Sequence, residues 1–187
     1  MVEANGLDMY FAIIDMINVG KRLGQYRLID GASGNMSCRI NDTLIITKTG
    51  AILDELTPQD FVILKLSDYS EEASSDLIIH KAIYEKTDYN AVLHCHGVYN
   101  VVLSFMMDEI VPMDFEGKIF LKKVKVVEDE SKEDLAEKIA EEIARRGIVI
   151  VRGHGIYSAG KDIRDAFNKA CYLEHSCEII YYVSGCR

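Results

Sequence analysis

The sequence predicts an α/β domain with a central, largely antiparallel sheet, and two observations support this fold class. Residues 36–40 and 43–47 are strand-like runs joined by Asn41-Asp42, a hairpin-length connection that lacks the usual glycine. Further along, apolar runs of strand length alternate with segments of helical periodicity. Hairpins beside such alternation favour a mixed sheet covered by helices. A chain of 187 residues fits one domain, and we expect residues 1–187 to form it.

The helices are expected where apolar residues recur every three or four positions between capping residues. Residues 7–24 show this spacing and end near Gly20 or Gly24. Ser131 and Gly147 frame a charged amphipathic segment. In chain order, helices are predicted at residues 7–24, 74–87, 99–107, 131–146 and 163–182.

The strands are expected in short runs rich in valine, isoleucine and leucine. Residues 148–152 begin with four apolar residues, which is typical of a strand buried on both faces. Strands are predicted at residues 36–40, 43–47, 60–66, 91–96, 148–152 and 156–158, and the stretch 110–127 is expected to be strand and loop.

Composition and charge argue against several classes of protein. Hydrophobic residues make up 49% of the chain and charged residues 27%, which favours a globular protein over a disordered one. The net charge is −9 and the basic residues are dispersed among acidic ones, so we expect no nucleic-acid partner. The apolar stretch 11–19 is interrupted by Asp15 and too short to span a bilayer, and the acidic start does not resemble a secretory signal. We therefore expect no membrane partner.

The cysteines indicate a reducing compartment. Their number is odd and none forms a Cys-x-x-Cys pair, so we expect reduced thiols in the cytoplasm and no cysteine zinc site. The five are Cys38, Cys95, Cys171, Cys177 and Cys186. An anionic substrate would have to be bound locally, by backbone amides, hydroxyl groups or a metal.

Three histidines form the most informative pattern in the sequence. His94 and His96 end the apolar run 90–93, so a strand would point both imidazoles to one side and Cys95 to the other. Convergent neutral imidazoles are the commonest way in which proteins hold a transition metal. His154 follows residues 148–152 in a similar setting, and three histidines leave a fourth position open, as catalytic metal sites do. The alternative is that these histidines only hydrogen-bond to neighbours at strand ends.

Three short polar segments are suited to binding an anion. Residues 30–37 are a small-residue loop whose amides can approach a ligand closely. Residues 47–50 offer two hydroxyls and an ammonium, and residues 74–76 (Ser-Ser-Asp) begin a helix whose N-terminal amides favour an anion. Each segment alone is also explained as a flexible connection or a plain helix cap. The three together indicate a phosphate pocket.

Asp76 and His80 are four residues apart and share one face of the predicted helix. The residues alone leave three interpretations open. The two side chains could be a further pair of metal ligands, or Asp76 could be an acid/base. Alternatively, Asp76 is a carboxylate at the helix N-terminus with His80 as its hydrogen-bonded neighbour.

As a set, these segments resemble the class II (zinc-dependent) sugar-phosphate aldolases, whose superfamily includes the adducin head domain. The resemblance covers about residues 8–183. The matching motifs are Gly34-Asn35-Met36-Ser37, Thr47-Lys48-Thr49-Gly50, Ser74-Ser75-Asp76 with His80, His94-Cys95-His96 and Gly153-His154-Gly155. The resemblance implies a three-layer α-β-α fold and a zinc ion, or another divalent transition metal, on His94, His96 and His154. The phosphate pocket that it implies comprises Gly34, Asn35, Thr49, Gly50, Ser74 and Ser75.

The resemblance also implies an activity. Enzymes of this kind reversibly cleave a ketose 1-phosphate, such as L-fuculose 1-phosphate, to dihydroxyacetone phosphate and an aldehyde through a metal-stabilised enediolate. Asp76 stands at the position of their catalytic carboxylate, which moves a proton at the carbon next to the broken bond. Family members form four-fold tetramers, which implies a homotetramer with the site at the subunit interface.

Departures from the aldolase pattern keep other activities open. The aldolases carry Glu where this chain has Asp76, whereas L-ribulose-5-phosphate 4-epimerases carry Asp. Larger relatives have a C-terminal extension with a catalytic tyrosine, whereas this chain ends at Arg187, after the last predicted helix. The segment 112–117, where Asp114 or Glu116 could replace a further acidic residue of the epimerases, is short. The compact form favours an aldolase. A 4-epimerase or a methylthioribulose-1-phosphate dehydratase is the alternative, and a non-catalytic adducin-like interaction module is the alternative of another class.

Overall fold

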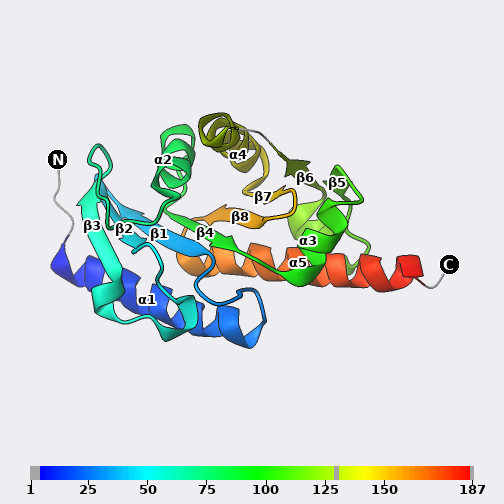
Figure 1. The fold of residues 1–187 in the computed structure, drawn as a ribbon, viewed down its shortest axis with the longest axis horizontal. Helices are drawn as coiled ribbons and strands as arrows, with labels where there is room; N and C mark the ends of the chain where they lie inside the picture. Colours follow the sequence, from blue (N-terminus) through cyan, green and yellow to red (C-terminus); the bar gives the residue numbers. More distant parts are fainter. Residues whose placement is uncertain (1–4, 129–130, 186–187) are drawn as a thin grey trace.

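A computed structural model describes residues 5–128 and 131–185, in which eight strands form one sheet (Figure 1). The spatial order is β3-β2-β1-β4-β8-β7-β6-β5. All neighbouring strands in this described sheet are antiparallel except β6 and β7, which are parallel. The strands are β1 (Asn35–Ile40), β2 (Thr43–Thr47), β3 (Phe61–Lys65), β4 (Ala91–Cys95), β5 (Glu109–Ile110), β6 (Val124–Val127), β7 (Ile148–Val151) and β8 (Gly155–Gly160). The predicted mixed, largely antiparallel sheet is confirmed.

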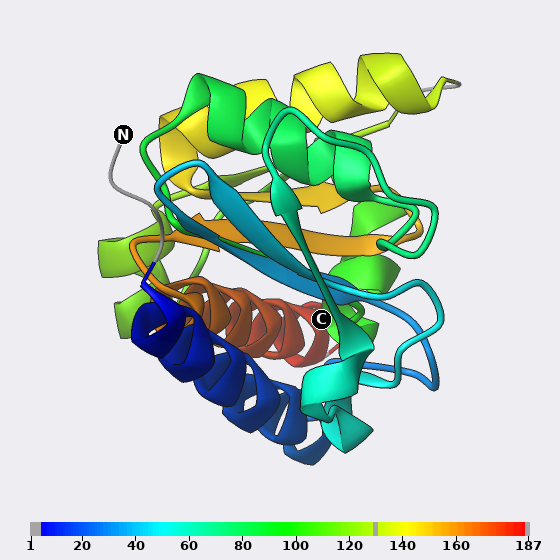
Figure 2. The ribbon, with the colours of Figure 1, turned by 90° about the vertical axis from the view of Figure 1, so that its left-hand side faces the viewer.

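Helices cover both faces of the sheet, as Figures 1 and 2 show. Helices α1 and α5 lie on one face, and α2 and α4 lie on the other. The helices are α1 (Gly6–Gln25), α2 (Leu77–Lys86), α3 (Val98–Ser104), α4 (Lys132–Arg146) and α5 (Ile163–Gly185). Short helical turns are η1 (Leu53–Glu55), η2 (Pro58–Asp60) and η3 (Gly117–Leu121). This arrangement confirms the three-layer α-β-α fold.

Each helical layer packs on its own hydrophobic core, because strand side chains alternate between the two faces. Leu93 of β4 belongs to the core under α1 and α5, whereas its neighbour Val92 belongs to the core under α2 and α4. Both side chains are fully buried. The centre of β4 is therefore covered by helices on both sides. His94 comes directly after these buried residues, within the same strand.

Most of the predicted elements are present, with small differences at their ends. The Asn41-Asp42 connection forms the hairpin without glycine because Asn41 itself adopts the left-handed conformation, with φ of 55°. Within 110–127, η3 is a helical turn where only strand and loop were expected. Five residues are too few for helical periodicity to appear in the sequence.

Two further expectations concern cysteines and membranes. The thiols of Cys38, Cys95, Cys171 and Cys177 are free, and Cys186 lies outside the described residues. In residues 5–128 and 131–185, no helix combines the length and the apolar character needed to cross a membrane.

Candidate metal centre and active site

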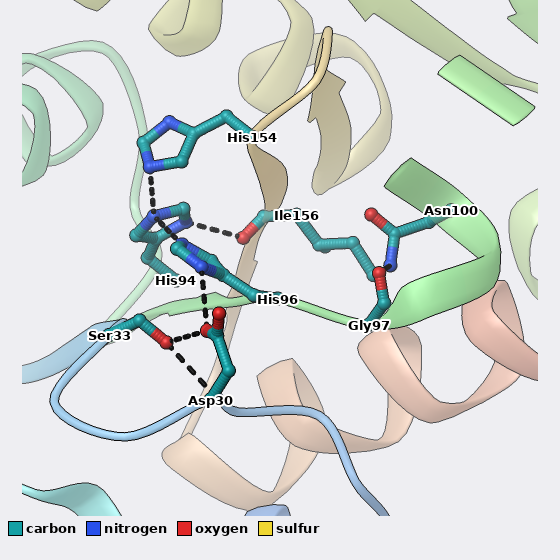
Figure 3. A network of polar contacts seen from close by, with 8 residues as sticks. All are labelled: Asp30, Ser33, His94, His96, Gly97, Asn100, His154 and Ile156. Carbon is teal, nitrogen blue, oxygen red and sulfur yellow. Dashed lines mark hydrogen bonds and ion pairs between the residues drawn. The ribbon is translucent and has the colours of Figure 1, made fainter. Parts of the chain in front are cut away.

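The three predicted metal-binding histidines come together at one end of the two central strands, β4 and β8. His94 is in β4, His96 follows the end of that strand, and His154 lies in the turn between β7 and β8. Figure 3 shows the three rings directed at one point. The Nε2 atom of His94 is 2.9 Å from that of His96 and 3.3 Å from that of His154. In the described part of the chain, these residues form the one group of histidine, cysteine or acidic side chains able to hold a metal ion.

In His94 and His96, a hydrogen-bond partner outside the cluster determines which ring nitrogen carries the proton. The Nδ1 atom of His94 lies 2.9 Å from the carbonyl oxygen of Ile156, which can only accept, so Nδ1 carries the proton. The Nδ1 atom of His96 lies 3.2 Å from Oδ1 of the Asp30 carboxylate, which likewise accepts. The Nε2 lone pairs of both rings therefore face the centre of the cluster.

This donor set fits a divalent metal ion. Unprotonated nitrogens at these separations repel one another unless a cation lies between them. A tetrahedral ion with metal–nitrogen bonds of about 2.0–2.1 Å would place its donors about 3.3 Å apart. Burial, reinforced by the neighbouring His96 and His154, holds the pKa of His94 well below its ordinary value. The ring is thus kept in the neutral form that a metal requires.

Asp30 contacts the His96 ring on the side that faces away from the cluster. Its carboxylate accepts from His96 and from the hydroxyl of Ser33 (Figure 3). The Ser33 hydrogen bond, together with His96, lowers the pKa of Asp30. Such carboxylate–histidine pairs orient the ring that binds a metal. Residues 30–37 were expected only to bind an anion, since nothing in the local sequence relates Asp30 to a histidine 66 positions away.

The turn after His96 is held by helix α5. The carboxylate of Glu174 accepts from the backbone N–H groups of Tyr99 at 2.8 Å and Asn100 at 3.0 Å. The side chain of Asn100 donates to the carbonyl of Gly97 at 2.8 Å (Figure 3). A Cβ atom at Gly97 would overlap a carboxylate oxygen of Glu174, so a larger residue there would displace that carboxylate. These contacts set the direction of the chain immediately after the histidine pair.

The turn that carries His154 is held by the end of helix α3. The N–H of Gly153 donates to the hydroxyl of Ser104 at 2.9 Å. Gly153 has φ of 66°, and a Cβ atom there would lie 2.8 Å from the ring of Phe105. Arg152 is ion-paired with Asp108 at 2.5 Å, which closes the turn from outside. The exposed ring of Phe105 therefore lies directly beside the His154 turn.

Asp76 is almost fully buried and connects to the metal cluster through Tyr157. Its Oδ2 atom accepts from the Asn35 side-chain amide at 2.9 Å and from the Tyr157 hydroxyl at 2.8 Å. The Tyr157 ring stacks on His94, with centroids 4.0 Å apart and planes 7° from parallel. Burial, with the adjacent Asp76 carboxylate, raises the pKa of Tyr157 well above its ordinary value, so its hydroxyl stays a donor. Tyr157 was not predicted as a site residue, although it lies opposite His94 once β4 and β8 are paired.

The side chain of Asp76 does not cap its own helix. Asp76 is the N-cap residue of α2, but its side chain makes no capping hydrogen bond. The two ring nitrogens of His80 contact Ser37 and Asn35. His80 is also outside the histidine cluster that could hold a metal. The carboxylate of Asp76 is therefore directed into the site rather than onto its own helix.

The three segments predicted to bind an anion are adjacent in space. The N–H of Thr49 donates to the carbonyl of Glu72 at 3.0 Å, and that of Ser74 donates to Thr47 at 2.9 Å, so the two turns are joined by backbone hydrogen bonds. Thr49, Ser74 and Ser75 line a cavity of about 440 Å³ at the start of α2. The remaining polar groups of 47–50 are engaged elsewhere: Lys48 pairs with Glu72 at 3.0 Å, and the Thr47 hydroxyl accepts from the backbone of Met36 at 3.2 Å.

The glycines of the predicted phosphate pocket have left-handed backbones. Gly34 has φ of 81°, and a Cβ atom there would lie 2.7 Å from the carbonyl oxygen of His94. Gly50 has φ of 74° with open space around it. Asn35 pairs with His94 across β1 and β4, so the small-residue loop meets the metal cluster at this point. Every predicted site residue thus lies at the end of the sheet formed by β1, β4 and β8 or in the turns beside α2.

Comparison with known proteins identifies the family. Residues 14–181 match the Class II Aldolase and Adducin N-terminal domain, which is most of the chain. The chain belongs to the class II aldolase and adducin family. It is 33% identical over 168 residues to the L-fuculose phosphate aldolase of Methanocaldococcus jannaschii, covering 87% of this chain and 92% of that protein.

Other class II aldolase relatives differ in activity. The fold matches the crystal structure of L-fuculose-1-phosphate aldolase from Thermus thermophilus with a TM-score of 0.89 and 30% identity, covering 92% of this chain and 94% of that one. The chain is also 26% identical over 174 residues to the methylthioribulose-1-phosphate dehydratase of Bacillus subtilis, covering 81% of this chain and 83% of that protein. Membership in the class II aldolase family therefore leaves the reaction to be argued from the site.

Proposed function

We propose that this protein is a metal-dependent aldolase that reversibly cleaves a ketose 1-phosphate, such as L-fuculose 1-phosphate, to dihydroxyacetone phosphate and an aldehyde. The observation that carries the proposal is the convergence of three imidazole nitrogens beside a buried carboxylate. In the cleavage direction, the C3–C4 bond breaks, the C4 hydroxyl loses its proton as the aldehyde forms, and C3 of the released fragment gains a proton.

His94, His96 and His154 are the proposed metal ligands, with zinc as the expected ion and another divalent transition metal as the alternative. When bound, the ion supplies Lewis-acid stabilisation of the negative charge that develops on the enediolate oxygens. Asp30 and the carbonyl of Ile156 hold two of the rings in the required tautomer. The open side of the cluster, toward the exposed His154, is where the substrate would enter.

Asp76 is the proposed acid/base that moves the proton at C3. Its carboxylate is buried and held by donors from Asn35 and Tyr157, which supports a fixed orientation toward the substrate. The substitution of Asp for the Glu of the aldolases shortens the side chain by one methylene. The two donors are on the strands that adjoin the strand of His94, which keeps the shorter side chain close to the metal ligands.

The proposed phosphate site comprises Gly34, Asn35, Thr49, Gly50, Ser74 and Ser75. The cavity bordered by Thr49, Ser74 and Ser75 supports this assignment, as does its place at the start of α2. A helix N-terminus presents amide protons and a partial positive charge to an anion. Binding the phosphate there would supply binding energy remote from the bond that breaks, and would orient that bond.

We also propose a cytoplasmic homotetramer with the site at a subunit interface. Exposed apolar side chains gather on α3, η3 and the end of α5, and Phe105 lies beside the turn that carries His154. A second copy of the chain covering this surface would bury apolar area next to the proposed metal site. Light scattering of the purified protein tests the assembly, and a monomer with full turnover would refute a shared site.

Two measurements test the proposed activity. Metal analysis of the purified chain is expected to give one divalent ion per subunit, and a coupled assay for triose phosphate is expected to detect cleavage within a panel of ketose 1-phosphates. Parallel assays for 4-epimerase and dehydratase activity cover the alternatives that Asp76 keeps open. A chain with no stoichiometric metal would leave the adducin-like interaction module as the better description.

Two variants assign the roles within the site. His94→Ala is expected to lose metal and activity together, since it removes a ligand at the centre of the cluster. Asp76→Asn is expected to keep the metal and lose turnover, because the amide cannot accept the proton. Asp88→Asn, at an exposed carboxylate after α2, is the matched control. Full activity of Asp76→Asn would remove Asp76 from the mechanism.

A further inference from the structure

A buried line of hydrogen bonds leads from helix α2 to the Asp76 carboxylate. His80 has no exposed surface, and both of its ring nitrogens are engaged. Its Nδ1 atom is 2.7 Å from the Ser37 hydroxyl, and its Nε2 atom is 2.6 Å from Oδ1 of Asn35. Beyond Ser37, the Tyr84 hydroxyl lies 2.8 Å from the same hydroxyl oxygen. Asn35 and Asp76 have roles in the proposed function, whereas His80, Ser37 and Tyr84 have none there.

The direction of every hydrogen bond in this line follows from one fixed end. Oδ2 of Asp76 accepts from the Tyr157 hydroxyl as well, and the group of Asn35 that faces this oxygen is the NH₂ group. The amide oxygen of Asn35 then faces His80 and must accept, so Nε2 of His80 carries the proton. The imidazole is therefore required to be the neutral Nε2–H tautomer.

The other side of the ring is consistent with this tautomer. Nδ1 of His80 has a lone pair and accepts the proton of the Ser37 hydroxyl. The Ser37 oxygen then accepts from Tyr84, whose hydroxyl is also 3.1 Å from the carbonyl of Ser37. In every hydrogen bond of this line, the donor is the group nearer to Tyr84 and the acceptor is the group nearer to Asp76. Each buried polar group in the line therefore has a partner.

Burial keeps the ring neutral. Desolvation lowers the pKa of His80 to about 4, an effect that the nearby Asp76 carboxylate only partly opposes. The partners Asn35, Ser37 and Tyr84 are uncharged, and the Asp76 carboxylate is the charged group that acts on the ring. A protonated ring would have two donors, so the Ser37 hydroxyl would have to turn its proton away from Nδ1 and accept there instead.

We propose that His80 is a positioning residue for the reaction, which in its neutral Nε2–H form locks the Asn35 side chain with its NH₂ group against the Asp76 carboxylate. The proposal rests on the proposed function, because it is Asp76 that acts on the substrate. Without the His80 donor, the amide of Asn35 can rotate by 180° and present its oxygen to the carboxylate. That orientation repels Asp76 and removes one of the two donors that hold it.

The tautomer is tested on the wild-type protein, independently of catalysis. Nitrogen-15 NMR of histidine-labelled protein distinguishes a protonated Nε2 from a protonated Nδ1, and the His80→Gln variant assigns the His80 signals by their loss. We expect one ring that remains the neutral Nε2–H tautomer from about pH 7.5 to about pH 5. A neutral Nδ1–H ring, or a charged ring at about pH 7, would overturn the proposal.

Variants test the consequence for the reaction. We expect His80→Leu to lower kcat by about 10- to 100-fold with unchanged metal content, as is typical when a supporting hydrogen bond is lost. In His80→Gln, the side-chain NH₂ group can replace Nε2–H, and we expect most of kcat to return. Tyr84→Phe, at the far end of the line, is the matched control and should change kcat less than about threefold. A folded His80→Leu protein with wild-type kcat would refute the positioning role.

A failure of the proposed function can be distinguished from a failure of the positioning role of His80. If the wild-type protein cleaves no sugar phosphate, the proposed function fails, whereas the NMR result still reports the tautomer that the geometry requires. If His80→Leu does not fold, the comparison of His80→Gln with wild type decides: a Gln variant as inactive as Asp76→Asn would contradict rescue by the donor.

Discussion

Acid should destabilise this protein in a way that depends on His80. The perturbation is the His80→Gln substitution, studied in metal-free protein so that the metal ligands behave alike in both chains. The pKa of His80 is about 4 in the folded protein because the ring is fully buried. In the unfolded chain, the pKa of histidine is about 6.5.

The sign follows from the protons bound in each state. Between about pH 6.5 and about pH 4, the unfolded chain holds a proton on His80 that the folded protein does not, so the free energy of unfolding falls as the pH falls. For these two pKa values, the His80 contribution lost between about pH 7.5 and about pH 4.5 is about 2.5 kcal/mol. Glutamine does not titrate, so the variant should lack this loss.

The assay is urea unfolding at a series of pH values and one protein concentration. Wild-type protein should lose about 2.5 kcal/mol more than His80→Gln over the window. His175→Gln, at an exposed histidine of α5, is the matched control. Equal slopes for wild type and His80→Gln would refute the reasoning, because they would mean that His80 binds its proton equally well in both states.

Three other outcomes are expected. Chelation of the metal should lower Tm reversibly. A ligand that binds only the folded state stabilises it by about 4 kcal/mol when the free ligand concentration is about a thousand times its Kd. An unchanged Tm after verified metal removal would argue against a bound ion. Gly34→Ala should cost about 2–4 kcal/mol in urea unfolding, and more than Gly31→Ala: both glycines have positive φ, but only the Cβ at Gly34 meets a backbone oxygen. Equal costs at the two positions would mean that the contact with His94 is unimportant. Glu174→Gln should cost about 1–3 kcal/mol by weakening the hydrogen bonds that begin α3, and no change in unfolding would contradict that role.

The elements of the fold were predictable because each has a strong local signal. Apolar periodicity located α1, the Ser131 and Gly147 caps located α4, and valine-rich runs located β4 and β7. The alternation of side chains along a strand also predicts that His94 and His96 lie on one side. The η3 turn was missed because a single turn shows no periodicity.

Only those residues of the candidate site that belong to a short sequence motif could be predicted. Asp30, Tyr157 and Glu174 support the site from positions whose local sequence carries no sign of that role. Each is brought to its partner by strand pairing or by helix packing, as when β8 sets Tyr157 opposite His94. His80 was noticed for its spacing from Asp76, yet its partners proved to be Ser37 and Asn35 of a different element, β1.

The position of β4 within the sheet has a consequence for motion. Strand β4 is hydrogen-bonded to β1 on one side and to β8 on the other and is buried throughout, so each of its ladder amides exchanges with solvent only when the ladder that holds it opens beneath the covering helices. Thr49 and Gly50 lie in a turn outside the ladders, where small local openings suffice. Amide hydrogen exchange should therefore be slowest around His94 and fast at the Thr49 turn. The proposed metal ligands lie at or just beyond the ends of the central strands, whereas the proposed phosphate-binding turns lie outside the ladders and can adjust while the central strands stay paired.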